Sequence, residues 1–169
     1  MRGNKNFSNT TFTRRVDRES GRHHTPRSMP EPAICEQCGS IYKNRRWTAG
    51  NDVRIDEGKS RVVTCPACKQ ENTGDVRGFV FLDGSFFVDH QNEIENLLRN
   101  ETERAAEDNV LARIIEWRQG EGHKLTLTTT TEHLAQRLAH SLEKAFGGEV
   151  RYAFSHENKL ARVSWKREH

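Results

Sequence analysis

Residues 35–47 read CEQCGSIYKNRRW, and residues 65–68 read CPAC. These two stretches hold all four cysteines of the chain, as two Cys-x-x-Cys pairs separated by 26 residues. Each pair lets two thiolates reach one ion from a tight loop, and two pairs supply the four tetrahedral ligands that Zn²⁺ prefers. The spacing predicts one structural zinc ion, with the ligands Cys35, Cys38, Cys65 and Cys68. A complete thiolate shell leaves no position for an activated water, so a catalytic zinc is not expected.

Two other uses of cysteine pairs fit the sequence less well. Disulfide pairing is disfavoured by the spacing and by the N-terminal residues, which lack the apolar core of a secretion signal. A thioredoxin-like redox site needs one Cys-x-x-Cys within a βαβ pattern, which these residues do not show. Gly39 directly after the first pair permits the backbone conformation of a metal-binding turn, and Pro66 stiffens the second turn.

Basic and aromatic residues follow the first cysteine pair. The segment between the pairs is long enough for a β-hairpin, as in zinc ribbons, and it is rich in arginine and lysine. Such side chains can contact phosphates, and an exposed Trp47 can stack on an unpaired base. The alternative is that Trp47 packs inside the ribbon and that the arginines are solvated. The candidate RNA contacts of this segment are Lys43, Arg45, Arg46, Trp47, Arg54, Lys59 and Arg61.

The 169-residue chain has few hydrophobic residues, and its charges are unevenly distributed. Only 33% of the residues are hydrophobic and 30% are charged, so a single large core is not expected and a structural metal would stabilise a small one. The net charge is +3, but residues 71–122 carry 12 acidic and 5 basic side chains. Residues 1–33 are basic with isolated apolar positions, which predicts a disordered, flexible tail. Such an arm either stays mobile or binds nucleic acid, through Arg14 and Arg15.

The remaining residues predict an α+β fold: a C4 zinc ribbon, then a helix, then a small domain. An apolar run before Asp83-Gly84 indicates an aromatic strand, and apolar spacing after it indicates a helix with many charges. A second helix has an apolar stripe, a threonine cap and a Gly147-Gly148 stop. The expected parts are a zinc-ribbon module with the aromatic strand at 34–87, a charged connecting helix at 88–109 and a β-β-α-β-β domain at 110–169.

No enzyme motif is present in the sequence. There is no Gly-rich phosphate loop, no Gly-x-Ser-x-Gly and no His-Glu-x-x-His. No apolar run reaches membrane-spanning length. These observations predict a non-enzymatic, cytoplasmic protein with no small-molecule substrate and no membrane partner.

The order of parts resembles a known family. The zinc site, the aromatic strand and the charged helix are followed by GHKLTLTTTTEHLAQRLAHSLEKAFGGEVRYAF at 122–154 and KLARVSW at 159–165. Over residues 30–167 the chain is similar to the N-terminal part of the archaeal and eukaryotic adaptor for nuclear export of the large ribosomal subunit, and more closely to short bacterial relatives of that adaptor. The resemblance implies zinc ligation by the four cysteines and contact with the large subunit. The adaptor has more cysteine sets, later barrel domains and export signals, so nuclear export is not implied.

The sequence therefore predicts a zinc-containing, ribosome-associated factor that binds rRNA of the large subunit or of the 70S particle. Its role would lie in assembly, the response to stalling, or hibernation, and ribosomal proteins are further candidate partners. Two alternatives stay open. One is a DNA-binding zinc-ribbon regulator, although no helix has the chemistry of a recognition helix. The other is a protein-interaction adaptor, in which the zinc module presents the C-terminal sheet to a partner.

Overall fold

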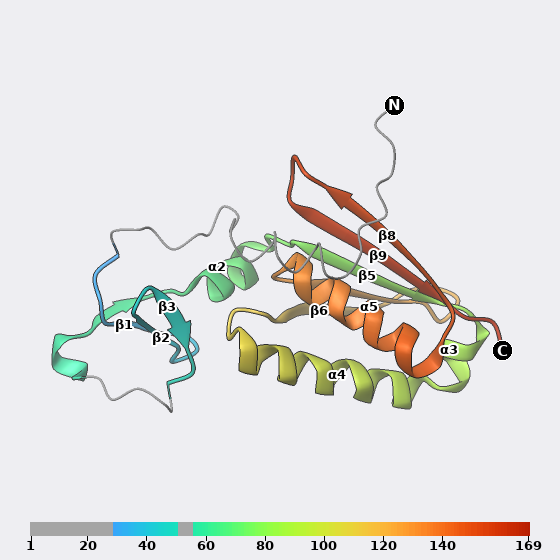
Figure 1. Ribbon diagram of the computed structural model, residues 1–169, viewed down its shortest axis with the longest axis horizontal. Helices are drawn as coiled ribbons and strands as arrows, with labels where there is room; N and C mark the ends of the chain where they lie inside the picture. The colour runs from blue at the N-terminus through green and yellow to red at the C-terminus, as the bar shows by residue number, and fades with distance from the viewer. Residues whose placement is uncertain (1–28, 51–55) are drawn as a thin grey trace.

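The computed structural model of the chain describes residues 29–50 and 56–169. A small sheet that carries the cysteines lies at one end of the molecule, and a larger unit of strands and helices lies at the other (Figure 1). Mixed helix and sheet content confirms the predicted α+β class. The predicted tail falls almost entirely on residues 1–28, outside the described residues.

The first unit is a four-stranded sheet in the order β3-β2-β1-β4. β1 pairs antiparallel with β2 and parallel with β4, while β2 and β3 form a hairpin. Each strand is three residues long, so backbone pairing alone gives this sheet little stability. The elements are β1 Ala33–Cys35, β2 Ile41–Lys43, β3 Arg46–Thr48, the 3₁₀ helix η1 Glu57–Lys59, β4 Arg61–Val63 and α2 Pro66–Thr73.

The second unit is a five-stranded mixed sheet in the order β6-β7-β5-β9-β8. β5 pairs antiparallel with β7 and parallel with β9, and two helices follow β5 before the chain returns as β6. The elements are β5 Gly78–Asp83, α3 Ser85–Asp89, α4 Gln91–Asp108, β6 Ile114–Gln119, β7 Leu125–Thr129, α5 Glu132–Phe146, β8 Glu149–Ser155 and β9 Leu160–Lys166.

The aromatic strand β5 is the centre of the second sheet, whereas the sequence pattern placed it in the zinc-ribbon module ending at residue 87. Its neighbours on both sides come from the C-terminal part of the chain. Val80 and Leu82 are 0% and 1% exposed, because this strand is paired along both edges and its inner face lies under helices. The local pattern predicts a strand, but it carries no information about which sheet the strand joins. The boundary between the units therefore lies after α2, not after residue 87.

Helix α5 lies across one face of the second sheet, and α4 packs along α5 (Figure 1). Thr131 caps α5 by accepting a hydrogen bond from Leu134 N at 3.1 Å, and Gly147 ends the helix with φ 68°. Both caps agree with the predicted helix. α4 is more than a connection, because Ile94 and Leu98 are fully buried in the core of this unit.

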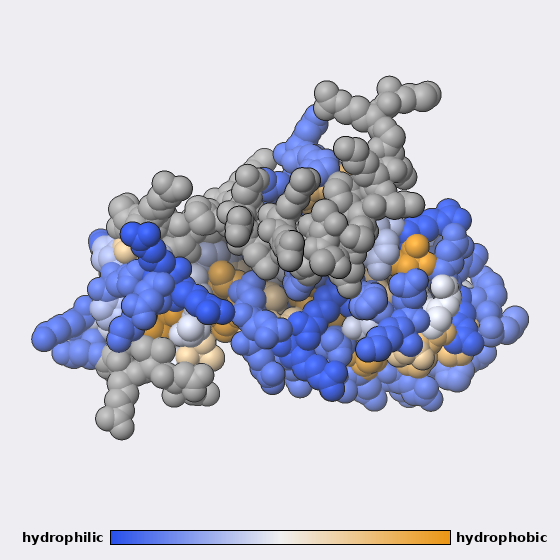
Figure 2. Space-filling model, viewed as in Figure 1, coloured by the Kyte–Doolittle hydropathy of each residue, from blue (hydrophilic) through white to orange (hydrophobic). Residues whose placement is uncertain are grey.

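The outward surface of α4 is mainly hydrophilic, as expected for a helix with one buried stripe (Figure 2). Arg104 on this surface is exposed, and its Nη1 lies 2.7 Å from Oε1 of Glu101, which is mostly buried beside α5. Within residues 29–50 and 56–169, no helix combines the length and the apolar composition needed to cross a bilayer.

Candidate metal centre

The four cysteine sulfurs lie in one cluster between β1 and α2. All four Sγ atoms are within 4.8 Å of one another, and the pairs Cys35–Cys68 and Cys38–Cys65 are each 3.7 Å apart. A tetrahedral Zn²⁺ at about 2.3 Å from each sulfur places the sulfurs about 3.8 Å apart, whereas a disulfide is about 2.05 Å long. All four cysteines are free of disulfides. The fold brings the predicted ligands together at a spacing that fits one tetrahedral metal ion.

The first pair lies on a turn that leaves β1. Cys35 N donates to Ser40 O at 2.8 Å, and Gly39 N donates to Cys35 O at 2.9 Å. Gly39 has φ 74°, a left-handed conformation that glycine adopts without a side-chain clash, as the sequence predicted. The same turn brings the Ser40 hydroxyl to 3.1 Å from Cys38 Sγ.

The second pair begins a helix, whereas the sequence pattern predicted a second tight turn. Cys65 is the N-cap of α2, Pro66 is its first residue, and Cys68 N donates to Cys65 Sγ at 3.4 Å. Cys65 N donates to Cys35 Sγ at 3.2 Å, which links the two pairs. The N–H groups at the start of a helix stabilise negative charge on nearby thiolates.

Burial and hydrogen bonding act in opposite directions on these thiols. Burial raises the pKa of Cys65 and of Cys68. Burial also opposes ionisation of Cys38, but hydrogen bonds from Ser40 and Arg113 outweigh it and lower the pKa of Cys38 to about 6. Near neutral pH Cys38 is therefore a thiolate. Cys65 and Cys68 keep their protons until a metal cation binds and displaces them.

Arg113 is a member of this site that the sequence did not reveal. Its Nη1 lies 3.3 Å from Cys68 Sγ, and its Nη2 lies 4.0 Å from Cys65 Sγ. Burial lowers the pKa of Arg113, but hydrogen bonds to the thiolates outweigh burial and raise it. Four thiolates around a divalent cation leave an excess of two negative charges, and the guanidinium offsets one of them. Arg113 follows Cys68 by 45 residues and has no local pattern that marks it.

Arg113 also joins the metal centre to the second unit. Its backbone N–H donates to Thr130 Oγ1 at 2.9 Å, and Gln70 Nε2 of α2 donates to Thr130 O at 2.8 Å. Val110 and Leu111, which precede β6, pack against the apolar core around the cysteines. A metal ion held by the cysteines would thus stabilise the contact between the two units as well as the small sheet.

The end of the β2–β3 hairpin presents three of the predicted RNA contacts. Lys43, Arg45 and Arg46 are exposed there. Asn44 and Arg45 form the two-residue turn with φ 53° and 59°, the left-handed pair that a type I′ hairpin requires. The carboxylate of Glu31 accepts hydrogen bonds from Asn44 N at 2.8 Å and from Arg45 N at 2.9 Å. The acidic side chain of Glu31 therefore holds the backbone of the basic turn in place.

The other candidate contacts have different surroundings. Trp47 is 7% exposed, and its ring centroid lies 5.4 Å from that of Tyr42 inside the cysteine-containing unit, so of the two alternatives for Trp47 the structure has core packing and not an exposed ring for base stacking. Lys59 and Arg61 are exposed at the β4 edge of the sheet, away from the hairpin turn. Lys59 Nζ lies 3.8 Å from an Asp56 oxygen. The remaining candidates, Arg14, Arg15 and Arg54, lie outside the described residues.

Comparison with known proteins gave no match. No protein-family model, no curated protein and no solved structure matches the chain. The resemblance to the ribosomal export adaptor and its bacterial relatives stays a prediction from the residues. What the site can do follows from its geometry: four cysteine sulfurs at this spacing can hold a metal ion, which would stiffen the sheet that carries the hairpin.

Proposed function

We propose that this chain is a zinc-containing, ribosome-associated factor that binds rRNA of the large subunit or of the 70S particle. In this proposal it acts in the cytoplasm and catalyses no reaction. The observation that carries the proposal is the exposed basic turn of Lys43, Arg45 and Arg46 on the sheet that the four cysteines brace. Zinc is the metal that best suits four thiolates at tetrahedral spacing in a structural site.

Rigidity makes this turn suitable for phosphate contacts. The strands are too short to hold the hairpin alone. The Glu31 carboxylate fixes the turn by two hydrogen bonds, and a metal ion bound by the cysteines would support the sheet that carries it. Arg45 occupies a left-handed conformation that costs a side chain about 1–2 kcal/mol relative to the ordinary one. Glycine is the favoured residue at this position of the turn, so the presence of arginine supports a role for its charge. The planar guanidinium of arginine can donate two parallel hydrogen bonds to the oxygens of one phosphate.

The order of parts supports ribosomal RNA as the partner. A zinc module followed by an α+β unit resembles the ribosome-binding part of the export adaptor family. The rRNA surface offers the phosphates that an exposed cluster of arginine and lysine recognises. Assembly, the response to stalling and hibernation all require this same contact, and ribosomal proteins would be secondary partners.

Sucrose-gradient sedimentation of a cell lysate tests the proposal. The full chain should co-migrate with the large subunit or with 70S particles, and high salt should release it because binding displaces counterions. The variant with Arg45→Glu and Arg46→Glu should move to the top of the gradient. Its matched control reverses two exposed charges on the helices, Arg104→Glu and Lys144→Glu, and should stay with the ribosome. Wild-type protein that remains at the top at low salt would refute the proposal.

A further inference from the structure

Among residues 29–50 and 56–169, helices cover one face of the five-stranded sheet, and the opposite face carries two phenylalanine rings on the central strand. Phe79 and Phe81 alternate along β5 with the core residues Val80 and Leu82. Phe81 is 37% exposed, and the two rings stack with their centroids 5.9 Å apart and an interplanar angle of 1°. Apolar rings at the middle of this face stay in contact with water and belong to no core, which points to a ligand for this face.

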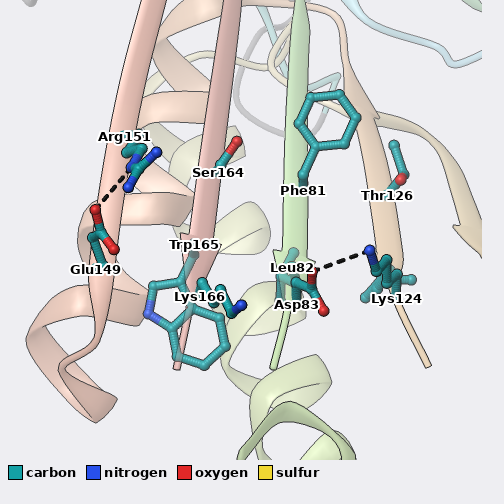
Figure 3. Close-up of a pocket in the computed structure, with 11 residues that line it drawn as sticks. Phe81, Leu82, Asp83, Lys124, Thr126, Glu149, Arg151, Ser164, Trp165 and Lys166 are labelled. Atoms are coloured by element: carbon teal, nitrogen blue, oxygen red, sulfur yellow. Dashed lines mark hydrogen bonds and ion pairs between the residues drawn. The ribbon is translucent and has the colours of Figure 1, made fainter. Parts of the chain in front are cut away.

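The strand register puts Phe81 at the centre of a row that crosses all five strands. Thr126 of β7 and Ser164 of β9 are its direct partners. Arg118 of β6 lies beyond Thr126, and Arg151 of β8 lies beyond Ser164. Figure 3 shows four of these five side chains across β7, β5, β9 and β8. The row is an aromatic ring between two hydroxyls, with an arginine at each end.

Further cations lie next to this row. Arg162 lies over the Phe79 ring, with its guanidinium carbon 5.7 Å from the ring centroid. Lys124 and Lys166 line a hollow of about 540 Å³ beside Phe81 (Figure 3), which is the size range of sites for nucleotide-sized ligands.

The two arginines of the row and the three further cations make five, and four of these five have an acidic neighbour. The closest nitrogen–oxygen distances lie between 2.8 and 3.2 Å. These ion pairs are solvent-exposed, so they are weak and can be exchanged for a phosphate. The pairs are Arg118–Glu116, Lys124–Asp83, Arg151–Glu149 and Lys166–Glu168.

We infer that this open face binds single-stranded RNA, with bases stacked on Phe79 and Phe81 and phosphates at the flanking arginines and lysines. RNA-recognition-motif domains stack bases in this way, on aromatic side chains of an exposed sheet face. Residues 77–83, RGFVFLD, also follow the first part of the pattern of such strands, which is a basic residue, glycine, an aromatic, one residue and phenylalanine.

Two positions of the pattern, Arg77 and Val80, do not face the proposed ligand, so the phosphate contacts fall to other basic residues of the open face. Arg77 is 9% exposed, and its guanidinium donates to Asn158 O at 2.9 Å, so this arginine is structural. Val80 replaces a small residue, and it does so on the core side of the strand, away from the proposed ligand. The cations that remain on the open face are Arg118 and Arg151 at its edges, Arg162 over Phe79, and Lys124 and Lys166 beside the hollow.

The surroundings of Phe81 favour an unpaired RNA strand over other ligands. A duplex keeps its base faces stacked inside, where no protein ring can reach them. Thr126 and Ser164 place hydroxyls on both sides of the ring, where they can bond the 2′-OH that distinguishes RNA from DNA. A protein partner would not require a cation at each end of an aromatic row. This site does not require the hairpin contact proposed above, because it lies on the other unit of the molecule.

Fluorescence anisotropy with the full zinc-loaded chain and a labelled, uridine-rich single-stranded RNA of about ten nucleotides tests the inference. Phe79→Ala and Phe81→Ala should each weaken binding roughly tenfold, because each removes one stacking platform. Phe81→Tyr should retain binding. Tyr152→Ala is the matched control: Tyr152 is 42% exposed on the same sheet, but its partner Val163 faces the core, so its ring lies on the helix side. This control should bind as the wild type does.

Three results would overturn the inference. The first is unchanged affinity in a double Phe79→Ala, Phe81→Ala variant whose circular dichroism spectrum shows the wild-type fold. The second is equal affinity for the matching single-stranded DNA, and the third is equal affinity for an RNA duplex of the same length. The Arg45→Glu, Arg46→Glu variant separates this site from the proposed ribosome contact. It should lose ribosome association while its affinity for the RNA oligomer stays near the wild-type value.

Discussion

Cys38 differs from the other three cysteines in its surroundings, and this difference determines how the metal centre responds to pH. Cys38 is exposed, whereas Cys35, Cys65 and Cys68 are at most 2% exposed. The Cys38 sulfur itself is partly covered, and hydrogen bonds from Ser40 and Arg113 overcome that desolvation, while burial dominates the pKa of Cys65 and of Cys68. One ligand is therefore ready to bind a cation near neutral pH, and two must first release protons.

Zinc affinity should fall as the pH falls. The raised pKa values of Cys65 and Cys68 mean that zinc displaces protons from both, so a lower pH favours the protonated, metal-free form. The slope should steepen below about pH 6, where Cys38 also takes up a proton. Competition with a chromophoric chelator at a series of pH values measures this dependence. An affinity that stays constant between about pH 6 and pH 8 would show that the ligands are already thiolates.

Arg113→Ala should weaken zinc binding roughly 10- to 100-fold, the range found for residues that support metal ligands. The change removes the guanidinium that hydrogen-bonds Cys68 Sγ and offsets the negative charge of the site. Arg137→Ala is the matched control, because Arg137 pairs with Glu101 and Asp108 on the helices instead. Chelator competition with both variants gives the comparison. Equal zinc affinities in the two variants would mean that Arg113 only connects the units.

The β2–β3 hairpin has very short strands and a turn with an unfavourable backbone conformation. Its strands contribute three residues each, and the turn places two non-glycine residues in left-handed conformations. Glu31 compensates by accepting hydrogen bonds from both turn N–H groups. Local sequence alone predicted the hairpin and its charges. It left open whether Trp47 packs inside the ribbon or stacks on a base, because the burial of that ring depends on the whole module.

Arg45→Gly should stabilise the hairpin while weakening ribosome association. Glycine adopts the φ of 59° without the clash that costs other residues about 1–2 kcal/mol, and the mutation removes one positive charge from the turn. Thermal unfolding of the zinc-loaded protein and gradient sedimentation report on the two effects separately. A variant that gains stability and keeps full ribosome association would show that the Arg45 side chain does not contact RNA.

The residues that the structure describes form two apolar cores joined by a small contact region. One core lies beneath the five-stranded sheet, and the other surrounds the cysteines. Their connection runs through Arg113, Gln70 and Thr130. This arrangement explains what the sequence could predict. The cysteine ligands and α5 follow local rules of spacing and capping, whereas the central position of β5 and the role of Arg113 depend on residues far apart in the chain.

Metal removal should unfold the small sheet and leave the larger unit folded. Structural zinc contributes on the order of 10 kcal/mol in zinc-finger peptides, and the three-residue strands have little else to hold them. The five-stranded sheet has its own core beneath α5. Hydrogen exchange after chelation should therefore show loss of protection over β1, β2, β3, β4 and α2, with β5, β7 and β9 still protected. Loss of protection over the whole chain would mean that the two units fold only together.

Ultraviolet cross-linking in cells, followed by mass spectrometry of RNA-linked peptides, tests most directly whether the zinc-braced hairpin contacts ribosomal RNA. The expected cross-linked RNA is that of the large subunit, and the expected peptides contain the basic turn at 43–46. The sheet face predicts a second group of cross-linked peptides that contain Phe79 and Phe81. Peptides confined to the hydrophilic surface of α4, or an absence of ribosomal RNA among the cross-linked species, would contradict the proposed function.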